Sequence, residues 1–191
     1  MSERTLKQII EKIDNTCVYD IAIKTPLERA DSISKRLKNE VFIKREDLQP
    51  VFSFKLRGAY TKIKSLRDVN SSKNLIAASA GNHAQGVALS ACKLGIKATI
   101  VMPTTTPKIK VDAVKNLGAK VILFGDSYDD AYKYAKNKSN KDKLEFIHPY
   151  DDIDVIAGQG TIGKEILDQQ NGKIDYIFIP VGGGGLLAGI A

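Results

Sequence analysis

The chain has 191 residues, of which 43% are hydrophobic and 27% charged, and its formal net charge is +7 at pH 7. This length suits one ordinary domain or two small ones that share a core. No apolar run approaches the roughly 20 residues that cross a bilayer, and the charged N-terminus MSERTLKQIIEKID lacks the apolar core of a signal peptide. We therefore expect a cytoplasmic protein without membrane contact. The lysines are spread over many segments, which argues against nucleic acid and favours an anionic small molecule as the partner.

The two cysteines indicate neither a disulfide nor a metal site. Cys17 and Cys92 lie far apart and match no metal-ligand spacing, so reduced thiols are expected. Both fall at apolar positions of helical patterns, where a free cysteine behaves as a small hydrophobe.

Helix and strand patterns alternate along the chain. Apolar residues at helical spacing predict a first helix from Leu6 to Cys17, and Pro26, a residue tolerated in a first turn, begins a second helix that runs towards Asn39. Further helices are predicted at about 55–69, at about 82–94, from Pro107, from near Ser127 and at about 154–169. Strand patterns occupy 41–45, 75–79, 98–102, 120–124 and 176–181. Short strands between helices indicate an α/β fold with a twisted parallel sheet and helices on both of its faces.

A lysine stands inside an apolar run, VFSFKLRGAY at 51–60. In one interpretation Lys55 lays its stem on apolar surface and keeps its charged head in water. In the other, a partly desolvated lysine loses its proton more easily and becomes a nucleophile. This stretch alone favours the first interpretation.

Two loops at strand-to-helix junctions are candidate anion sites. Four glycines, 182–185, follow the strand pattern YIFIPV and precede an apolar helix, so the backbone can approach a phosphate closely there. The same residues match a relaxed dinucleotide pattern, which is a weak signal without its acidic partner. The second loop, SAGNHAQG at 79–86, offers hydroxyl, amide and backbone N–H groups that suit a carboxylate, and a simple helix cap explains it about as well. A single histidine such as His83 is more often structural than a base.

Taken together, these features point to one cofactor. In open parallel sheets such junctions gather at the carboxyl edge, where ligands bind. A nucleophilic lysine beside a phosphate cradle is what pyridoxal phosphate requires.

Three motifs, SFKLRGA, SAGNHAQG and VGGGGL, occur in an order that resembles the fold type II pyridoxal-phosphate enzymes, whose architecture is that of the tryptophan synthase β subunit. Longer stretches are similar to the biosynthetic threonine dehydratases, namely KREDLQPVFSFKLRGAY, ASAGNHAQGVA, VMPTTTPKIKVDAV and IAGQGT. The resemblance runs from about Thr25 to Ala191.

The resemblance implies a role for each motif. Lys55 would form the Schiff base with the cofactor, and Phe54 would pack against it. Asn82 would bind the phenolic oxygen of the cofactor. The substrate carboxylate would be held by Ser79, Ala80, Gly81, Asn82 and His83, and the phosphate by Gly182, Gly183, Gly184, Gly185 and Leu186. Related serine racemases carry a serine at the position of Ala80, so the resemblance implies elimination rather than racemisation here.

The implied reaction is the deamination of L-threonine to 2-oxobutanoate and ammonia, which opens isoleucine biosynthesis. The alternatives are a catabolic dehydratase acting on L-serine or L-threonine and, in a different class, a dinucleotide-binding module. We expect residues 1–56 and 150–191 to belong to an incomplete larger cofactor-binding domain, and residues 57–149 to form an inserted smaller domain. The sequence stops within an apolar helix pattern, which predicts a fragment lacking the rest of the catalytic domain and a regulatory domain. A homotetramer is expected at full length.

Overall fold

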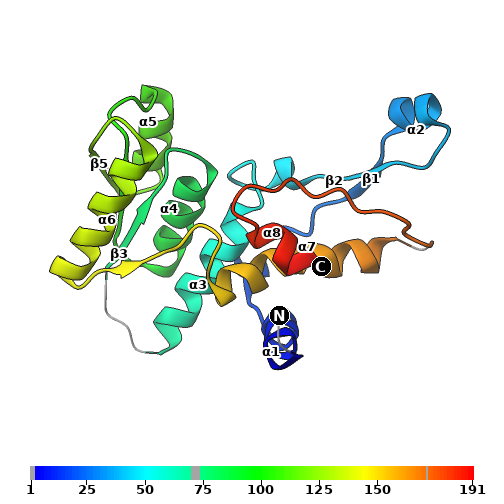
Figure 1. Ribbon diagram of the computed structural model, residues 1–191, viewed down its shortest axis with the longest axis horizontal. Helices are drawn as coiled ribbons and strands as arrows, with labels where there is room; N and C mark the ends of the chain where they lie inside the picture. Colours follow the sequence, from blue (N-terminus) through cyan, green and yellow to red (C-terminus); the bar gives the residue numbers. More distant parts are fainter. Residues whose placement is uncertain (1–2, 70–73, 171) are drawn as a thin grey trace.

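The computed structural model describes residues 3–69, 74–170 and 172–191. A parallel sheet with its helices lies at one end of the molecule, and α1 (Glu3–Asp14) projects near the middle (Figure 1). The opposite end carries α2 (Asp31–Leu37) beyond a two-stranded antiparallel sheet of β1 (Leu27–Arg29) and β2 (Phe42–Lys44). Two short 3-10 helices, η1 (Val18–Asp20) and η2 (Glu46–Leu48), flank these elements in the chain.

The larger sheet has four parallel strands in the order β5-β4-β3-β6. The strands are β3 (Leu75–Ala78), β4 (Ala98–Met102), β5 (Lys120–Leu123) and β6 (Glu145–Phe146). They alternate in sequence with α4 (Asn82–Leu94), α5 (Lys108–Asn116) and α6 (Tyr128–Asp142). This arrangement confirms the predicted α/β class with a parallel sheet.

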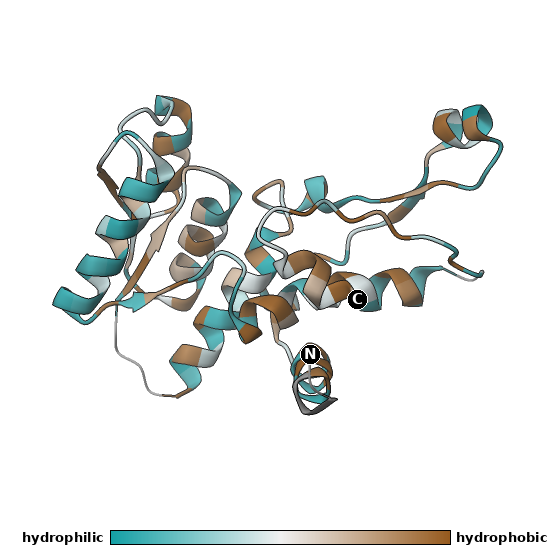
Figure 2. Cartoon of the chain, viewed as in Figure 1, coloured by the Kyte–Doolittle hydropathy of each residue, from teal (hydrophilic) through white to brown (hydrophobic). Residues whose placement is uncertain are grey.

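Successive residues of the strands point to opposite faces of the sheet, and each face has its own core. On one face Leu75, Ala77 and Ile100 pack with α3 (Lys55–Asp68), α4 and α5. On the other face Ile76 and Val101 pack against small residues of α6. Figure 2 shows the apolar strands between helices whose outer surfaces are polar. Because both faces are covered, β3 is buried along its whole length.

The helix α7 (Ile153–Gln169) crosses its neighbouring helices at close range. It packs against α3, α1 and α8 (Gly185–Ile190). A Cβ built at Gly158 would lie 2.6 Å from the carbonyl oxygen of Arg57, and one at Gly189 would lie 2.5 Å from that of Ile156. Glycine therefore allows the backbones of α3, α7 and α8 to approach more closely than any other residue would.

Two predicted elements differ from the structure. The helix expected from Pro26 is wrong in its first part, because Leu27–Arg29 forms β1 and pairs with β2, and the helix begins only at Asp31. The pairing with a distant strand overrides a weak local preference. Residues 176–181 form no strand, because none of the described segments pairs with them, and the side chain of Phe178 is 93% exposed. The structure also contains β6, which no prediction included.

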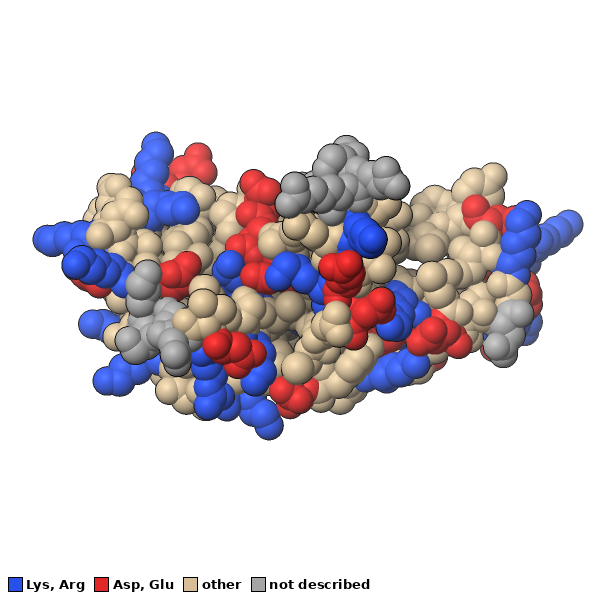
Figure 3. All heavy atoms as spheres, turned by 90° about the horizontal axis from the view of Figure 1, so that it is seen from below, with Lys and Arg blue, Asp and Glu red and all other residues tan. Residues whose placement is uncertain are grey.

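The exposure of the two cysteines differs from the expectation, and the charged side chains are distributed over the surface. Cys17 and Cys92 are exposed rather than packed among apolar residues, because the first helix ends at Asp14 and because Cys92 lies on an outer position of α4. On the face shown in Figure 3, acidic and basic side chains alternate along the middle, and basic ones stand at both ends. Within the described ranges, no helix is long and apolar enough to cross a membrane.

Candidate active site

A hollow of about 290 Å³ lies between the start of α3 and the loop before α8. Its lining comes from two stretches that are far apart in sequence, together with one residue from between them: Phe54, Lys55, Tyr150, Pro180, Val181, Gly182, Gly183, Gly184, Gly185 and Leu186. The lysine run and the glycine loop, two of the three motifs, therefore meet at one site.

Lys55 is the first residue of α3 and reaches into this hollow. Its Nζ donates a hydrogen bond to the carbonyl oxygen of Pro149 at 3.1 Å and lies 5.3 Å from the ring centre of Phe54. Burial lowers the pKa of Lys55, because the charged amine loses hydration and no carboxylate in the described part of the chain compensates for it. A cation in a first turn also faces the positive end of the helix dipole. Both effects favour the neutral amine, which is the nucleophilic form.

The glycine loop has a backbone that suits an anion. Gly184 has φ +87°, in the left-handed region that glycine adopts without strain. The next residues begin α8, whose first N–H groups have no acceptor within the helix. A Cβ at Gly182 or Gly184 would meet nothing within 4 Å, so the loop is open there. A lysine with a lowered pKa, facing the first N–H groups of a helix, fits a cofactor that carries both an aldehyde and a phosphate.

Tyr150 closes one side of the loop. A Cβ at Gly183 would stand 2.2 Å from Cδ1 of the Tyr150 ring, and one at Gly185 would stand 2.8 Å from its carbonyl oxygen. The same ring packs edge-on against His148 at 4.7 Å between centres. Sequence reasoning missed Tyr150 because nothing in HPYDD indicates that it contacts a loop some thirty residues later.

The third motif lies beside the hollow rather than in its wall. None of the residues 79–83 lines it, and Asn82 is exposed at the start of α4. His83 is buried, and its Nε2 lies 3.1 Å from the carbonyl oxygen of Ile147. Burial, with a smaller contribution from the charge of Lys55, lowers the pKa of His83 to about 4, so the ring is neutral at neutral pH. His83 thus supports the segment whose Pro149 accepts the bond from Lys55.

A second contact joins this motif to α3. A Cβ at Gly86 would lie 3.0 Å from the backbone nitrogen of Leu56, so α4 crosses α3 directly beside Lys55. The roles assigned to Phe54, Asn82 and the two loops stay predictions. Within the described ranges, no three His, Cys, Asp or Glu side chains gather as metal ligands.

Comparisons with known proteins identify the family of this chain. The family model of pyridoxal-phosphate dependent enzymes matches residues 18–191. The chain is 59% identical over 184 residues to the chloroplastic biosynthetic threonine dehydratase of Arabidopsis thaliana, covering 96% of this chain and 31% of that protein. It is 51% identical over 174 residues to the biosynthetic L-threonine dehydratase of Escherichia coli K12, covering 91% of this chain and 34% of that protein.

Solved structures show the same fold. The processed form of threonine deaminase isoform 2 from Solanum lycopersicum superposes with a TM-score of 0.96 at 53% identity, covering 100% of this chain and 52% of that one. Maize serine racemase has a TM-score of 0.88 at 35% identity, covering 97% of this chain and 55% of that one. The chain therefore spans about a third of the curated relatives and about half of the solved chains. Since the family model matches nearly its whole length, the chain belongs to the pyridoxal-phosphate dependent enzymes.

Proposed function

We propose that the full-length protein deaminates L-threonine to 2-oxobutanoate and ammonia, the first step of isoleucine biosynthesis. The observation that carries the proposal is the partly buried Lys55, whose pKa is lowered, on the same hollow as the glycine loop. The names of the relatives at 51–59% identity support threonine as the substrate. Family membership favours this function over the dinucleotide-binding alternative. A catabolic dehydratase acting on L-serine or L-threonine would use the same site.

In this proposal Lys55 would hold pyridoxal phosphate covalently, Phe54 would pack on it and Asn82 would bind its phenolic oxygen. Backbone N–H groups of the loop 182–186 would bind its phosphate. When bound, the cofactor supplies an electron sink for negative charge at the substrate Cα. The loop 79–83 would hold the substrate carboxylate.

The residues of the chain would act on one proton, the one on the substrate Cα. The amine of Lys55 takes the Cα proton of threonine, and burial, which lowers the pKa of Lys55, favours its unprotonated form. The carbonyl oxygen of Pro149 orients Nζ. Ala80 has no hydroxyl that could return a proton to the opposite face, which disfavours inversion of the stereocentre. Elimination is then the favoured outcome, in which the substrate loses its Cα proton and its hydroxyl, overall as water.

Borohydride reduction and peptide mapping test the assignment. The label should lie on the peptide that contains Lys55, and Lys55→Ala should abolish both the label and ammonia release. Lys64→Ala, on an outer part of the same helix, is the matched control and should keep both. A label on Lys44 or Lys62 would overturn the site.

Two finer expectations need their own measurements. Incubation with L-serine should give pyruvate and almost no D-serine, and substantial D-serine would refute the argument from Ala80. Analytical ultracentrifugation of the full-length protein tests the expected homotetramer. The cytoplasmic location stays a prediction, since the named relatives include a chloroplastic protein.

A further inference from the structure

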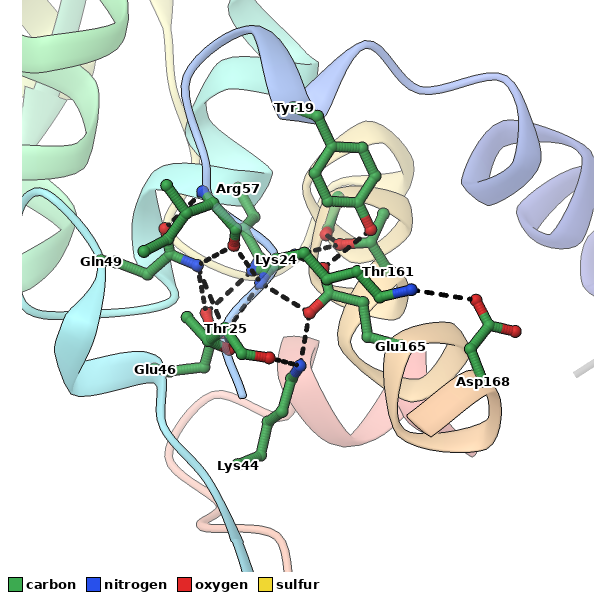
Figure 4. A network of polar contacts seen from close by, with 12 residues as sticks. Tyr19, Lys24, Thr25, Lys44, Glu46, Gln49, Arg57, Thr161, Glu165 and Asp168 are labelled. Atoms are coloured by element: carbon green, nitrogen blue, oxygen red, sulfur yellow. Dashed lines mark hydrogen bonds and ion pairs between the residues drawn. The ribbon is translucent and has the colours of Figure 1, made fainter. Parts of the chain in front are cut away.

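Arg57 lies two residues after Lys55 in α3, and none of its surface is exposed. Its guanidinium binds two carboxylates at once. Glu46 accepts from Nε at 2.8 Å and from Nη2 at 2.7 Å, and Glu165 accepts from Nη1 at 2.6 Å. Thr161 Oγ1 accepts a further bond from Nη1 at 3.0 Å. Figure 4 shows these groups converging on the guanidinium from different elements.

Other side chains hold the two carboxylates in turn. Glu165 pairs with Lys44 Nζ at 2.5 Å and accepts a hydrogen bond from the hydroxyl of Tyr19 at 2.7 Å. Glu46 accepts one from the hydroxyl of Thr25 at 2.6 Å. Burial opposes ionisation of Glu165, but the bonds from the guanidinium and from Lys44 outweigh it and keep its pKa below the usual value. Two cations therefore face two carboxylates, and the charges balance.

This cluster joins four segments that are far apart in the chain. They are the stretch 19–25, β2 with η2, the first turn of α3, and α7. Taking these charges out of water is costly, and apolar residues of similar volume often stabilise a fold equally well. Stability alone therefore does not account for the cluster. A planar arginine fork held by two carboxylates does impose one geometry on the groups it joins.

The geometry reaches Lys55 through the backbone. Successive residues of an α-helix turn by about 100°, so residues two apart point to nearly opposite sides. Lys55 points into the hollow, and Arg57 points away from it into the cluster. The N–H of Arg57 donates to the carbonyl oxygen of Phe54 at 3.0 Å, so both lie in the same turn. Fixing the guanidinium therefore fixes the turn that carries the amine.

We propose that Arg57, held by Glu46 and Glu165, is a positioning residue that sets the place of the Lys55 amine relative to Pro149 and the glycine loop. The proposal rests on the proposed function of Lys55. A lysine at position 57 would keep the positive charge, but it lacks the planar fork and would lose the geometry that joins the two carboxylates. The effect on Lys55 would travel through the backbone of this one turn.

The test compares Arg57→Lys and Glu165→Gln with wild type in the full-length protein. Arg67→Lys, in the exposed last turn of the same helix, is the matched control. In the apo protein, the pH dependence of Lys55 acetylation, followed by mass spectrometry, reports the pKa of its amine. In the holoenzyme, the pH dependence of the cofactor absorbance and the separate values of kcat and KM for threonine are measured.

We expect both cluster variants to remain folded by circular dichroism and to change the titration of Lys55. They should lower kcat by about 10- to 100-fold, the cost of a displacement of about 1 Å, and change KM less. Arg67→Lys should match wild type in every readout. Cluster variants that titrate and turn over like wild type would overturn the proposal, as would a failure of both to fold, which would make the cluster a stability element only.

The two proposals fail in different ways. If wild-type protein takes no borohydride label at Lys55, the proposed function is wrong, whatever the variants do. If wild type is labelled and the variants leave the apo titration of Lys55 unchanged, the proposed function stands and the positioning role of Arg57 is wrong.

Discussion

Replacing His83 with glutamine should remove the contribution of this one residue to the acid sensitivity of folding. The imidazole is 4% exposed, and its Nε2–H donates to the carbonyl oxygen of Ile147. A glutamine places its amide nitrogen near the same point, so it can keep this bond without carrying a titratable group. The positive charges that disfavour a protonated ring come from Lys55 on α3 and His148 after β6.

The magnitude follows from the pKa of His83 in the two states. It is 6.5 in the unfolded chain and about 4 in the folded protein. Between these values the unfolded chain binds a proton that the folded protein does not, so stability falls as pH falls through this window. The gap is worth about 3 kcal/mol of unfolding free energy, of which about 2 kcal/mol is lost between about pH 7.5 and about pH 5.

Urea unfolding of the apo protein, followed by circular dichroism at several pH values, measures the contribution of His83 to the unfolding free energy. The difference between wild type and His83→Gln at each pH cancels the other titrating groups, and it should shift by about 2 kcal/mol in favour of the variant between about pH 7.5 and about pH 5. His148→Asn is the control, since His148 is only partly buried and should give a smaller change. A pH dependence of His83→Gln equal to that of wild type would show that the histidine is not held neutral by burial.

Three further substitutions test local features. Phe52 has φ +55°, so Phe52→Gly should be about 1 kcal/mol more stable than Phe52→Ala in urea unfolding, and equal stabilities would contradict a left-handed backbone there. Gly183→Ala should lower the midpoint of thermal unfolding, because its Cβ would meet the ring of Tyr150, whereas Gly182→Ala should not; equal midpoints would mean that the ring moves freely. Ser127→Ala should cost about 1 kcal/mol of unfolding free energy by removing the cap of α6, and a neutral result would show that the cap does not form.

The alternation of elements and the position of the three motifs could be predicted from sequence because both depend on local patterns. Short apolar strand patterns that alternate with helical patterns indicate βαβ units whatever the rest of the chain does. Lys55 and the glycine loop 182–185 were therefore expected at one sheet edge, and the structure places them on one hollow.

Other features depend on partners that are far away in the chain, and only the tertiary structure decides them. Leu27–Arg29 becomes a strand because Phe42–Lys44 pairs with it, and 176–181 does not because no described segment does. The local sequence around Lys55 favours a lysine whose charged head stays in water, because the loss of hydration that lowers its pKa comes from groups packed around it from elsewhere in the chain. The Arg57 cluster also could not be predicted from the local sequence, since a buried arginine is stable only where carboxylates from other segments meet it.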